Sequence, residues 1–153
     1  MLEPMTESSF SKYLEQSVVI YAKENVASGR WPEQGALARS VKEFSQLLPQ
    51  GLNSPNQHLF HICNPQTGEH VGILWLSIEP DSLSAFIFDI EIDAPFRRQG
   101  FATQALKQAE AFAKSQGMAK IGLHVFHNNT SAQTLYTALG YRVVSSNMAK
   151  ALF

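Results

Sequence analysis

The sequence contains a single cysteine, Cys63, among its 153 residues. One thiol cannot form a disulfide within the chain, and a domain of about 150 residues buries roughly two-thirds of its unfolded surface without needing disulfides or a structural metal. A reducing compartment is the simplest setting for such a chain. We therefore predict a cytoplasmic protein that folds as one domain over residues 1–153.

The sequence also lacks an excess of either charge. Its 12 Lys and Arg balance 13 Asp and Glu, which gives a formal net charge of −1 at pH 7. Without a basic excess, neither a nucleic acid nor an anionic membrane surface is expected as a partner. The first ten residues have no basic segment ahead of an apolar run, and no apolar run approaches the roughly 18 residues of a membrane span.

No repeat, low-complexity tract or long linker divides the chain, so its elements are predicted from hydrophobic spacing. The first apolar stripe has helical spacing and comprises Phe10, Tyr13, Leu14, Val18 and Tyr21. A second helix, ending before Pro49, is predicted to bury an inner face of Leu37, Val41, Phe44, Leu47 and Leu48. The intervening loop, which contains Trp31, is expected to be exposed.

From His58 onward, short runs rich in Ile, Val, Leu and Phe are separated by turn residues, which predicts an antiparallel meander. Its strands are expected at about 59–63, 70–78 and 83–92. The remaining elements are predicted as a helix at 101–113, a strand at 120–126, a short helix at 130–139 and a final strand from Tyr141. This order predicts an α+β domain.

The junction at residues 92–103, Ile-Asp-Ala-Pro-Phe-Arg-Arg-Gln-Gly-Phe-Ala-Thr, takes a predicted strand through a tight turn into a helix. The first amides of a helix have no partner within it and carry the positive end of its dipole, so they bind anions. Gly100 allows close backbone approach, and Arg97 and Arg98 add positive charge. An ordinary helix start with two solvated arginines is the alternative. The junction matches neither a P-loop nor a dinucleotide fingerprint.

Two motifs together resemble the GCN5-related N-acetyltransferases. The first is Arg97-Arg98-Gln99-Gly100-Phe101-Ala102, similar to the signature Arg/Gln-x-x-Gly-x-Gly/Ala of that family. The second is the segment 129–141, Asn-Thr-Ser-Ala-Gln-Thr-Leu-Tyr-Thr-Ala-Leu-Gly-Tyr. The resemblance covers about residues 71–144. It implies a mixed, mostly antiparallel sheet flanked by helices, with strands splayed apart at an acetyl-coenzyme A site.

The resemblance also implies roles for individual residues. The backbone amides expected to hold the pyrophosphate belong to Gln99, Gly100, Phe101, Ala102 and Thr103. The pantetheine arm would lie between residues 88–92 and 121–125. The backbone amide of Ile92 would hold the thioester carbonyl, Asn129 would contact the cofactor arm, and Ala132 would let the arm pass closely. Tyr136 would protonate the leaving thiolate. The residue on its own is better explained as a core aromatic of an amphipathic helix, and it is the surrounding motif that favours the catalytic role.

The general base is sought among the acids of the third meander strand. Asp89, Glu91 and Asp93 alternate, so an ideal strand places them on one face, where they would attract an ammonium and raise one another's pKa. The alternative is a solvated face opposite Phe86, Phe88, Ile90 and Ile92, and a bulge would break the alternation. Best-known family members carry a glutamate or histidine earlier on this strand, where Phe86 and Phe88 stand here. A water relay to Asp89 or Glu91, or deprotonation by bulk water, remains open.

The histidines offer little chemistry. His58 and His61 lie near Cys63, but on a strand the two imidazoles point to opposite faces, so no metal site is predicted. His124 and His127 have the same spacing and are kept as reserve candidates for the base.

We therefore predict an acetyl-coenzyme A-dependent N-acetyltransferase in which a primary amine attacks the thioester directly within a ternary complex. A covalent route through Cys63 is disfavoured because that residue matches no family motif. The acceptor is a small-molecule or peptide amine, bound beside the first two helices and the Arg30-Trp31 loop. The alternative is a non-catalytic acyl-coenzyme A-binding sensor or assembly module. A homodimer is left open, as is strict selectivity for the acetyl group.

Overall fold

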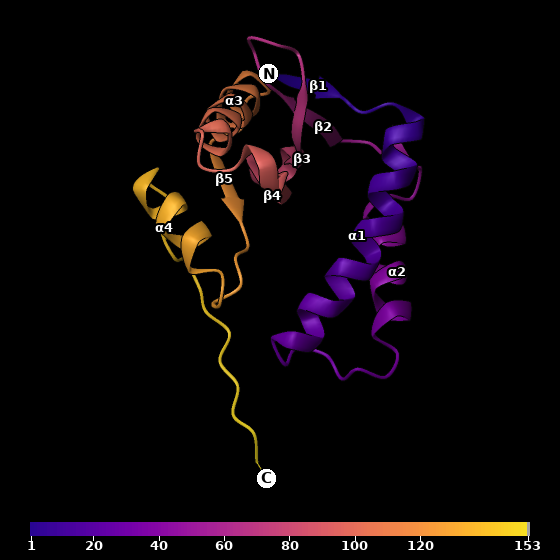
Figure 1. Cartoon of the computed structure of the whole chain (residues 1–153). Helices are drawn as coiled ribbons and strands as arrows, with labels where there is room; N and C mark the ends of the chain where they lie inside the picture. The colour runs from indigo at the N-terminus through magenta and orange to yellow at the C-terminus, as the bar shows by residue number, and fades with distance from the viewer. Residues whose placement is uncertain (153) are drawn as a thin grey trace.

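The computed structural model describes residues 1–152 and is built on a five-stranded sheet in the order β1-β2-β3-β4-β5 (Figure 1). The strands are β1 (Leu2–Pro4), β2 (Gln57–Cys63), β3 (His70–Glu79), β4 (Ser84–Ile92) and β5 (Lys120–Leu123). The first four run antiparallel to their neighbours and β5 runs parallel to β4. The predicted mixed, mostly antiparallel sheet and its meander are therefore confirmed. Strand β1 was not predicted, because three residues are too few to show a period.

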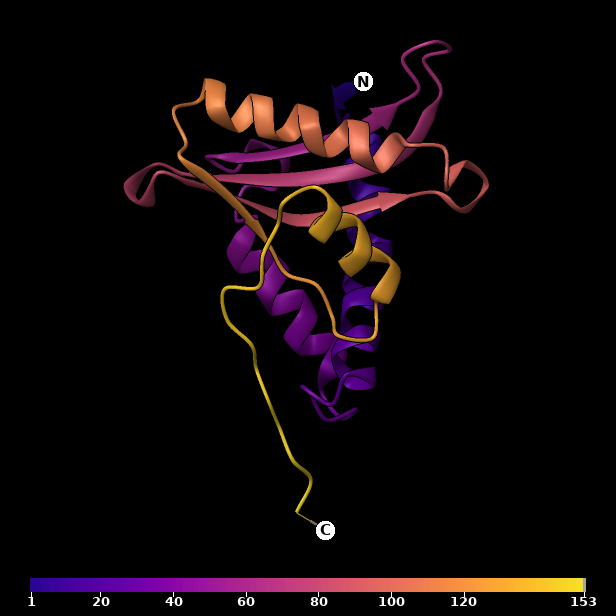
Figure 2. The same ribbon diagram turned by 90° about the vertical axis from the view of Figure 1, so that its left-hand side faces the viewer.

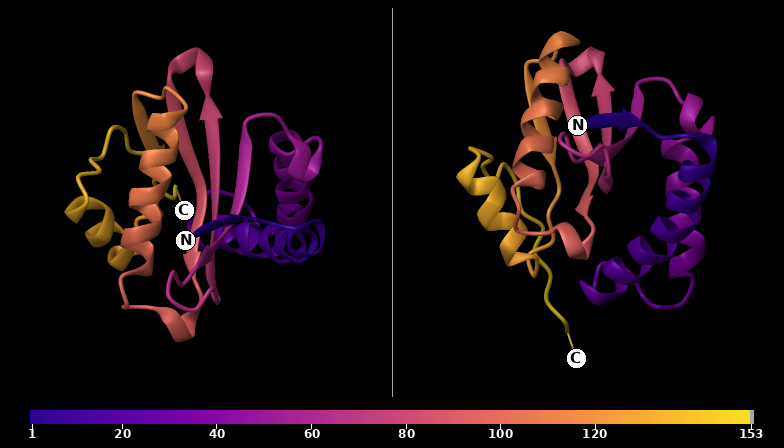
Figure 3. Two further views of the ribbon diagram at one scale, coloured as in Figure 1. Left: turned by 90° about the horizontal axis from the view of Figure 1, so that it is seen from above. Right: turned by 45° about the horizontal axis from the view of Figure 1, so that its top comes forward.

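Helices cover both faces of the sheet. They are α1 (Glu7–Ala27), α2 (Ala36–Leu47), α3 (Phe101–Ser115) and α4 (Thr130–Ala138), with 3-10 turns at Gly51–Asn53, Pro80–Ser82 and Ala94–Phe96. Figure 3 shows α3 on one face and the α1–α2 pair on the other. No helix within residues 1–152 is long and apolar enough to cross a bilayer.

Each face of the sheet has its own core. The core toward α3 includes Ile62, Val71, Leu74, Leu76, Ile87 and Leu106, and α4 packs against it through Leu135, Tyr136 and Leu139. The core toward α1 and α2 includes Met5, Phe10, Phe44, Leu48, Leu59 and Trp75. A sheet apolar on both faces requires both layers of helices, since neither face can be left to water.

The two N-terminal helices meet through small residues of α2 as well as large apolar ones. In α1 the stripe from Phe10 to Tyr21 faces the sheet, as expected. Phe44 of α2 and Leu48 directly after it are buried as predicted, but Leu37, Val41 and Leu47 are 53%, 47% and 36% exposed, so the inner position predicted for these three is wrong. Helix α2 instead turns its small residues inward, and the Ser40 hydroxyl donates to the carbonyl oxygen of Val18 at 2.6 Å. Small side chains let the helix backbones approach, which rotates the larger residues outward.

A bulge in β4 changes which of its residues face α1 and α2. Trp75 pairs with Asp89, but the next residue, Leu76, pairs with Ile87, so Phe88 is the extra residue. The Phe88 ring lies 4.7 Å from that of Trp75, and Asp89 accepts a hydrogen bond from Tyr13 of α1. The side chains of Phe88 and Asp89 therefore lie on the same face of the sheet, whereas ideal alternation had placed them on opposite faces.

The final strand predicted from Tyr141 is wrong for the described residues. Beyond α4 the chain forms no helix or strand through residue 152, and it runs away from the sheet (Figures 1 and 2). A strand needs a partner for its backbone groups, and this segment does not reach the free edge of β5. Strand β5 itself ends at Leu123 instead of Phe126. The apolar side chains left exposed are Val143, Val144, Met148 and Leu152.

Candidate active site

The turn before α3 leaves backbone amides free at a helix N-terminus. Arg98 and Gly100 both adopt left-handed conformations, with φ of 61° and 85°. The amide of Gln104 donates to the Gly100 carbonyl at 3.1 Å, so it closes the first turn of the helix. The amides of Phe101, Ala102 and Thr103 precede that bond and have no acceptor among residues 1–152. This arrangement suits a phosphate or pyrophosphate.

The two arginines of the turn differ in placement. Arg97 donates from Nε to the Ile92 carbonyl oxygen at 2.8 Å, and its Nη2 lies 3.6 Å from Oε1 of Glu91. Both contacts hold the Arg97 side chain against the last residues of β4 and stabilise the end of that strand. Arg98 is exposed and forms no ion pair among the described residues, so its charge is free to act beside the helix start.

Strands β4 and β5 part where the family resemblance implies a cofactor channel. Their pairing ends at Ile87 and Leu123, so residues 88–92 have no strand partner on that side within residues 1–152. Residues 121–123 are still paired, hence the divergence begins later on β5 than predicted. The amide of Asp93 donates to Val71 of β3. Because successive amides alternate in direction, the amide of Ile92 points away from β3, toward the divergence.

The second motif folds as a capped helix beside this divergence. The Asn129 side chain accepts a hydrogen bond from the Ala132 amide at 3.3 Å and so caps α4. Gln133 donates to the carbonyl oxygens of Phe126 and His127 at 3.1 and 2.7 Å, which ties α4 to the loop after β5. Asn129 thus has a structural role in addition to the cofactor contact expected from the resemblance.

Tyr136 of α4 and Asp89 of β4 are electrostatically coupled. Burial raises the pKa of the Tyr136 hydroxyl, and the negative charge of Asp89 raises it further. The phenol therefore holds its proton at neutral pH and is available as a donor. The neighbouring ring of Tyr141 lies 5.9 Å away and its hydroxyl donates to Glu110 at 2.9 Å, so the two tyrosines have different partners.

Asp89 is a partly buried carboxylate whose side-chain partner is Tyr13. The Tyr13 hydroxyl donates to its Oδ2 at 2.6 Å. Burial raises the pKa of Asp89 from 3.8 to about 6; the hydrogen bond from Tyr13 lowers it and the charge of Glu91 raises it. A carboxylate with a pKa this close to neutrality is ionised at pH 7 and still basic enough to accept a proton.

A cavity of about 430 Å³ opens on the side of the sheet where Asp89 and Tyr13 meet, between β3, β4 and the α1–α2 pair. Its aromatic lining comprises Tyr13, Tyr21, Phe44, Trp75 and Phe88, and its acidic lining comprises Glu24, Glu43, Asp89 and Glu91. No Lys or Arg lines it. Such a volume suits a small molecule, and the lining suits a cation with an apolar body.

Sequence reasoning missed several members of this lining. Tyr13 and Tyr21 were assigned to a core stripe, which is correct for their rings but overlooks their hydroxyls. Glu24 and Glu43 are ordinary helix acids in the sequence, and nothing in their spacing marks them. The Arg30-Trp31 loop, predicted to lie beside the acceptor, contacts two residues of the lining through Arg30. The Arg30 guanidinium donates to the Tyr21 hydroxyl at 3.0 Å and lies 3.7 Å from the Glu43 carboxylate.

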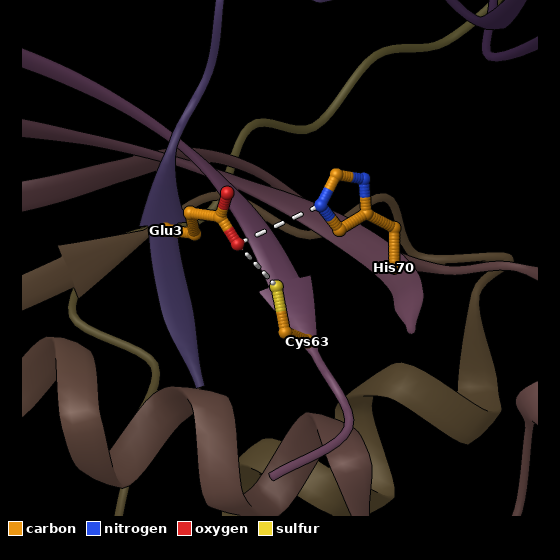
Figure 4. Close-up of side chains that lie close together, drawn as sticks. All are labelled: Glu3, Cys63 and His70. Atoms are coloured by element: carbon orange, nitrogen blue, oxygen red, sulfur yellow. Dashed lines mark hydrogen bonds and ion pairs between the residues drawn. The ribbon is translucent and has the colours of Figure 1, made fainter. Parts of the chain in front are cut away.

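The histidines lie elsewhere. His58 packs on Phe112 of α3, while His61 stacks on His70 on the other face, so the predicted opposition of His58 and His61 is confirmed. His124 and His127 are exposed. Figure 4 shows Glu3 of β1, Cys63 at the end of β2 and His70 at the start of β3 close together, with the Cys63 thiol donating to Glu3 at 3.4 Å. Three ligand types meet there, and the absence of a metal stays a prediction.

The raised pKa of Asp89 predicts a pH-dependent gain in stability from Asp89→Asn. In the folded protein the Asp89 carboxyl group keeps its proton up to about pH 6, whereas in the unfolded chain it loses that proton near pH 3.8. Folding therefore carries a penalty that is full above pH 6 and disappears toward pH 4, at most about 3 kcal/mol. The amide should raise the free energy of unfolding by roughly 1–3 kcal/mol at pH 7.5, and the gain should shrink as the pH falls to 4.

Urea unfolding at pH 7.5 and pH 4 measures this difference. Glu91→Gln is the control, since its side chain is 54% exposed; its effect should stay within about 0.5 kcal/mol at both pH values. A gain for Asp89→Asn that does not change with pH would contradict the assignment.

Comparison with known proteins agrees with this geometry. The model of the acetyltransferase (GNAT) family matches residues 23–141. The N-acetyltransferase YycN of Bacillus subtilis is 37% identical to this chain, and the match covers 99% of this chain and 98% of YycN. The N-acetyltransferase YdgE of the same organism is 36% identical, and the match covers 99% of this chain and 97% of YdgE. The chain belongs to the GNAT family and is an acyltransferase.

Solved structures give the same result. The crystal structure of YycN from Bacillus subtilis superposes with a TM-score of 0.93, covering 100% of this chain and 98% of that chain. The aminoglycoside N-acetyltransferase AAC(6')-Iy, solved in complex with CoA, has a TM-score of 0.57 over 72% of this chain and 89% of that chain, at 19% identity. At that identity the likeness shows the fold alone.

Proposed function

We propose that this protein transfers the acetyl group of acetyl-coenzyme A to a primary amine by direct attack within a ternary complex. The observation that carries the proposal is the position of Asp89. It lies at the β4 bulge, beside the point where β4 leaves β5, and it also lines the cavity beneath α1 and α2. A carboxylate there is within reach of an amine arriving from the cavity and a thioester arriving from the divergence.

The cofactor would be held by the free amides from Gln99 to Thr103, with Arg98 adding charge and Arg97 fixing the end of β4. The phosphates belong at these amides because a helix N-terminus favours anions. The pantetheine arm would follow residues 88–92 past Ala132 and Asn129. The amide of Ile92 would donate to the thioester oxygen as negative charge develops on it.

Three proton and charge movements complete the transfer. Asp89 takes a proton from the incoming ammonium, and Glu91, at the cavity rim, helps attract that cation. The neutral amine attacks the carbonyl carbon and the new C–N bond forms. As the C–S bond breaks, Tyr136 donates its proton to the departing thiolate, and the nitrogen loses its second proton, which restores Tyr136 through solvent. Asp89 releases the first proton to solvent, so the products are the amide, the free thiol and one proton.

Tyr136→Phe tests the acid. Turnover should fall by roughly 10-fold to 10,000-fold, because only the proton donor is removed. Affinity for acetyl-coenzyme A should stay within a factor of about three, since the ring and its packing remain. Release of free thiol over a panel of amines measures turnover, and calorimetry measures the affinity.

Tyr141→Phe is the matched control. It removes a hydroxyl from the neighbouring ring, but that hydroxyl binds Glu110 and is not aimed at the divergence. Its turnover should match the wild type. Equal turnover of Tyr136→Phe and the wild type across the pH range would remove Tyr136 from the mechanism.

A further inference from the structure

The acids of the cavity lie toward its two ends. Tyr13 holds Asp89 at one end. Glu24 comes eleven positions after Tyr13 in α1, so its Cα lies roughly 16 Å farther along the helix axis. Helical side chains lean toward the N-terminus, which brings the Glu24 carboxylate back over the cavity. Glu24 lies at the exposed mouth of the cavity, where partial burial and the charges of Asp89 and Glu91 raise its pKa, so the acids influence one another across this space.

Only one of the two acids at the α1–α2 end has a cationic partner. Glu43 lies 3.7 Å from Arg30, whereas Glu24 forms no ion pair with any group of residues 1–152. Like charges that face one space repel until a cation enters. Glu24 is therefore the acid whose charge a ligand would balance.

The wall between the two ends is apolar. It is formed by the rings of Phe44, Trp75 and Phe88. The centroid of the Trp75 ring lies 5.7 Å from that of Phe44 and 4.7 Å from that of Phe88. The polar edge of Trp75 is already occupied, because its indole nitrogen donates to Gln57 at 2.7 Å. The hydroxyl groups of a sugar-based amine would lose their hydrogen bonds against these rings, whereas methylene groups gain from burial there.

From these observations we infer that the acceptor is a diamine whose two ammonium groups are joined by an apolar spacer. The reacting amine lies at Asp89, the spacer lies on Trp75 and Phe88, and the second ammonium binds Glu24. This inference rests on the proposed function, in that it names the substrate class of the same site.

Cadaverine and n-pentylamine test it, because they share a spacer length and differ in the second ammonium. Calorimetry with the protein saturated with coenzyme A should show cadaverine binding about 10-fold more tightly, and added salt should reduce that ratio. Thiol release with acetyl-coenzyme A should show the same preference in KM. Equal affinity for the two amines would overturn the inference.

Charge removal at Glu24 locates the second ammonium. Glu24→Gln should weaken cadaverine far more than n-pentylamine, so that the two amines bind with nearly equal affinity. Glu15→Gln is the matched control and should keep the preference for cadaverine, because Glu15 is an exposed acid of α1 outside the cavity lining. A variant that weakens both amines equally would contradict the assignment. Binding of cadaverine without acetyl transfer would overturn the proposed function alone, and transfer without a preference would overturn the diamine alone.

Discussion

Asp89→Asn is expected to lower turnover by roughly 100-fold to 10,000-fold at pH 7.5, the usual contribution of a positioned general base. The amide keeps the size of the carboxylate and can still accept the hydrogen bond from Tyr13, but it cannot take a proton. Acetyl-coenzyme A affinity should not change, because the phosphate site lies at the start of α3. Steady-state thiol release and cofactor calorimetry measure the two quantities.

The pH profile separates a base from a residue that only shapes the cavity. In the wild type, kcat/KM should rise with pH to about 6 and then level, since the pKa of Asp89 is about 6. Tyr13→Phe should move this limb to higher pH, because the Tyr13 hydroxyl lowers the pKa of Asp89. Glu91→Gln should affect mainly the KM of the amine. A full rate for Asp89→Asn with an unchanged limb would leave deprotonation to another group or to bulk water.

The Asp89 assignment also shows where strand periodicity stops being informative. Alternation alone placed the acids of β4 opposite Phe88. One extra residue at the bulge brings Phe88 and Asp89 to the same face, and no local sequence signal fixes the position of that residue. A bulge depends on how β4 must diverge from β5 while staying paired with β3, and this is a property of the whole sheet.

The regions predicted well are those where local chemistry decides. Gly100 and Gly117 adopt the left-handed conformations that bound α3, and the apolar spacing of α3 matches its buried face. The positions of Leu37, Val41 and Leu47 in α2 were predicted wrongly because Ser40 packs against the backbone of α1, which the spacing of large apolar residues does not show. The final strand was predicted from the sequence pattern after Gly140, but a strand also needs a neighbouring edge.

Gly100→Asp is expected to weaken acetyl-coenzyme A binding by at least about 100-fold, because like charges placed together in a binding site cost several kcal/mol. Gly100 adopts φ of 85° directly before the free amides, and a Cβ there would meet no atom within 4 Å. The added carboxylate would therefore enter the space in front of the helix without disturbing the packing of the protein. Its charge would bind the amides that are expected to hold the pyrophosphate.

Gly100→Asn separates the charge from the backbone conformation. Asparagine has nearly the same size and, like aspartate, tolerates a left-handed conformation better than most residues, so both variants share the conformational cost. The asparagine variant should lose less than about 10-fold in affinity, and thermal unfolding should show both variants folded. Removing the phosphates from the ligand should weaken wild-type binding strongly but change binding to Gly100→Asp little, since that variant has already lost the contact. Equal affinities of the two variants for acetyl-coenzyme A would mean that the phosphates bind away from the start of α3.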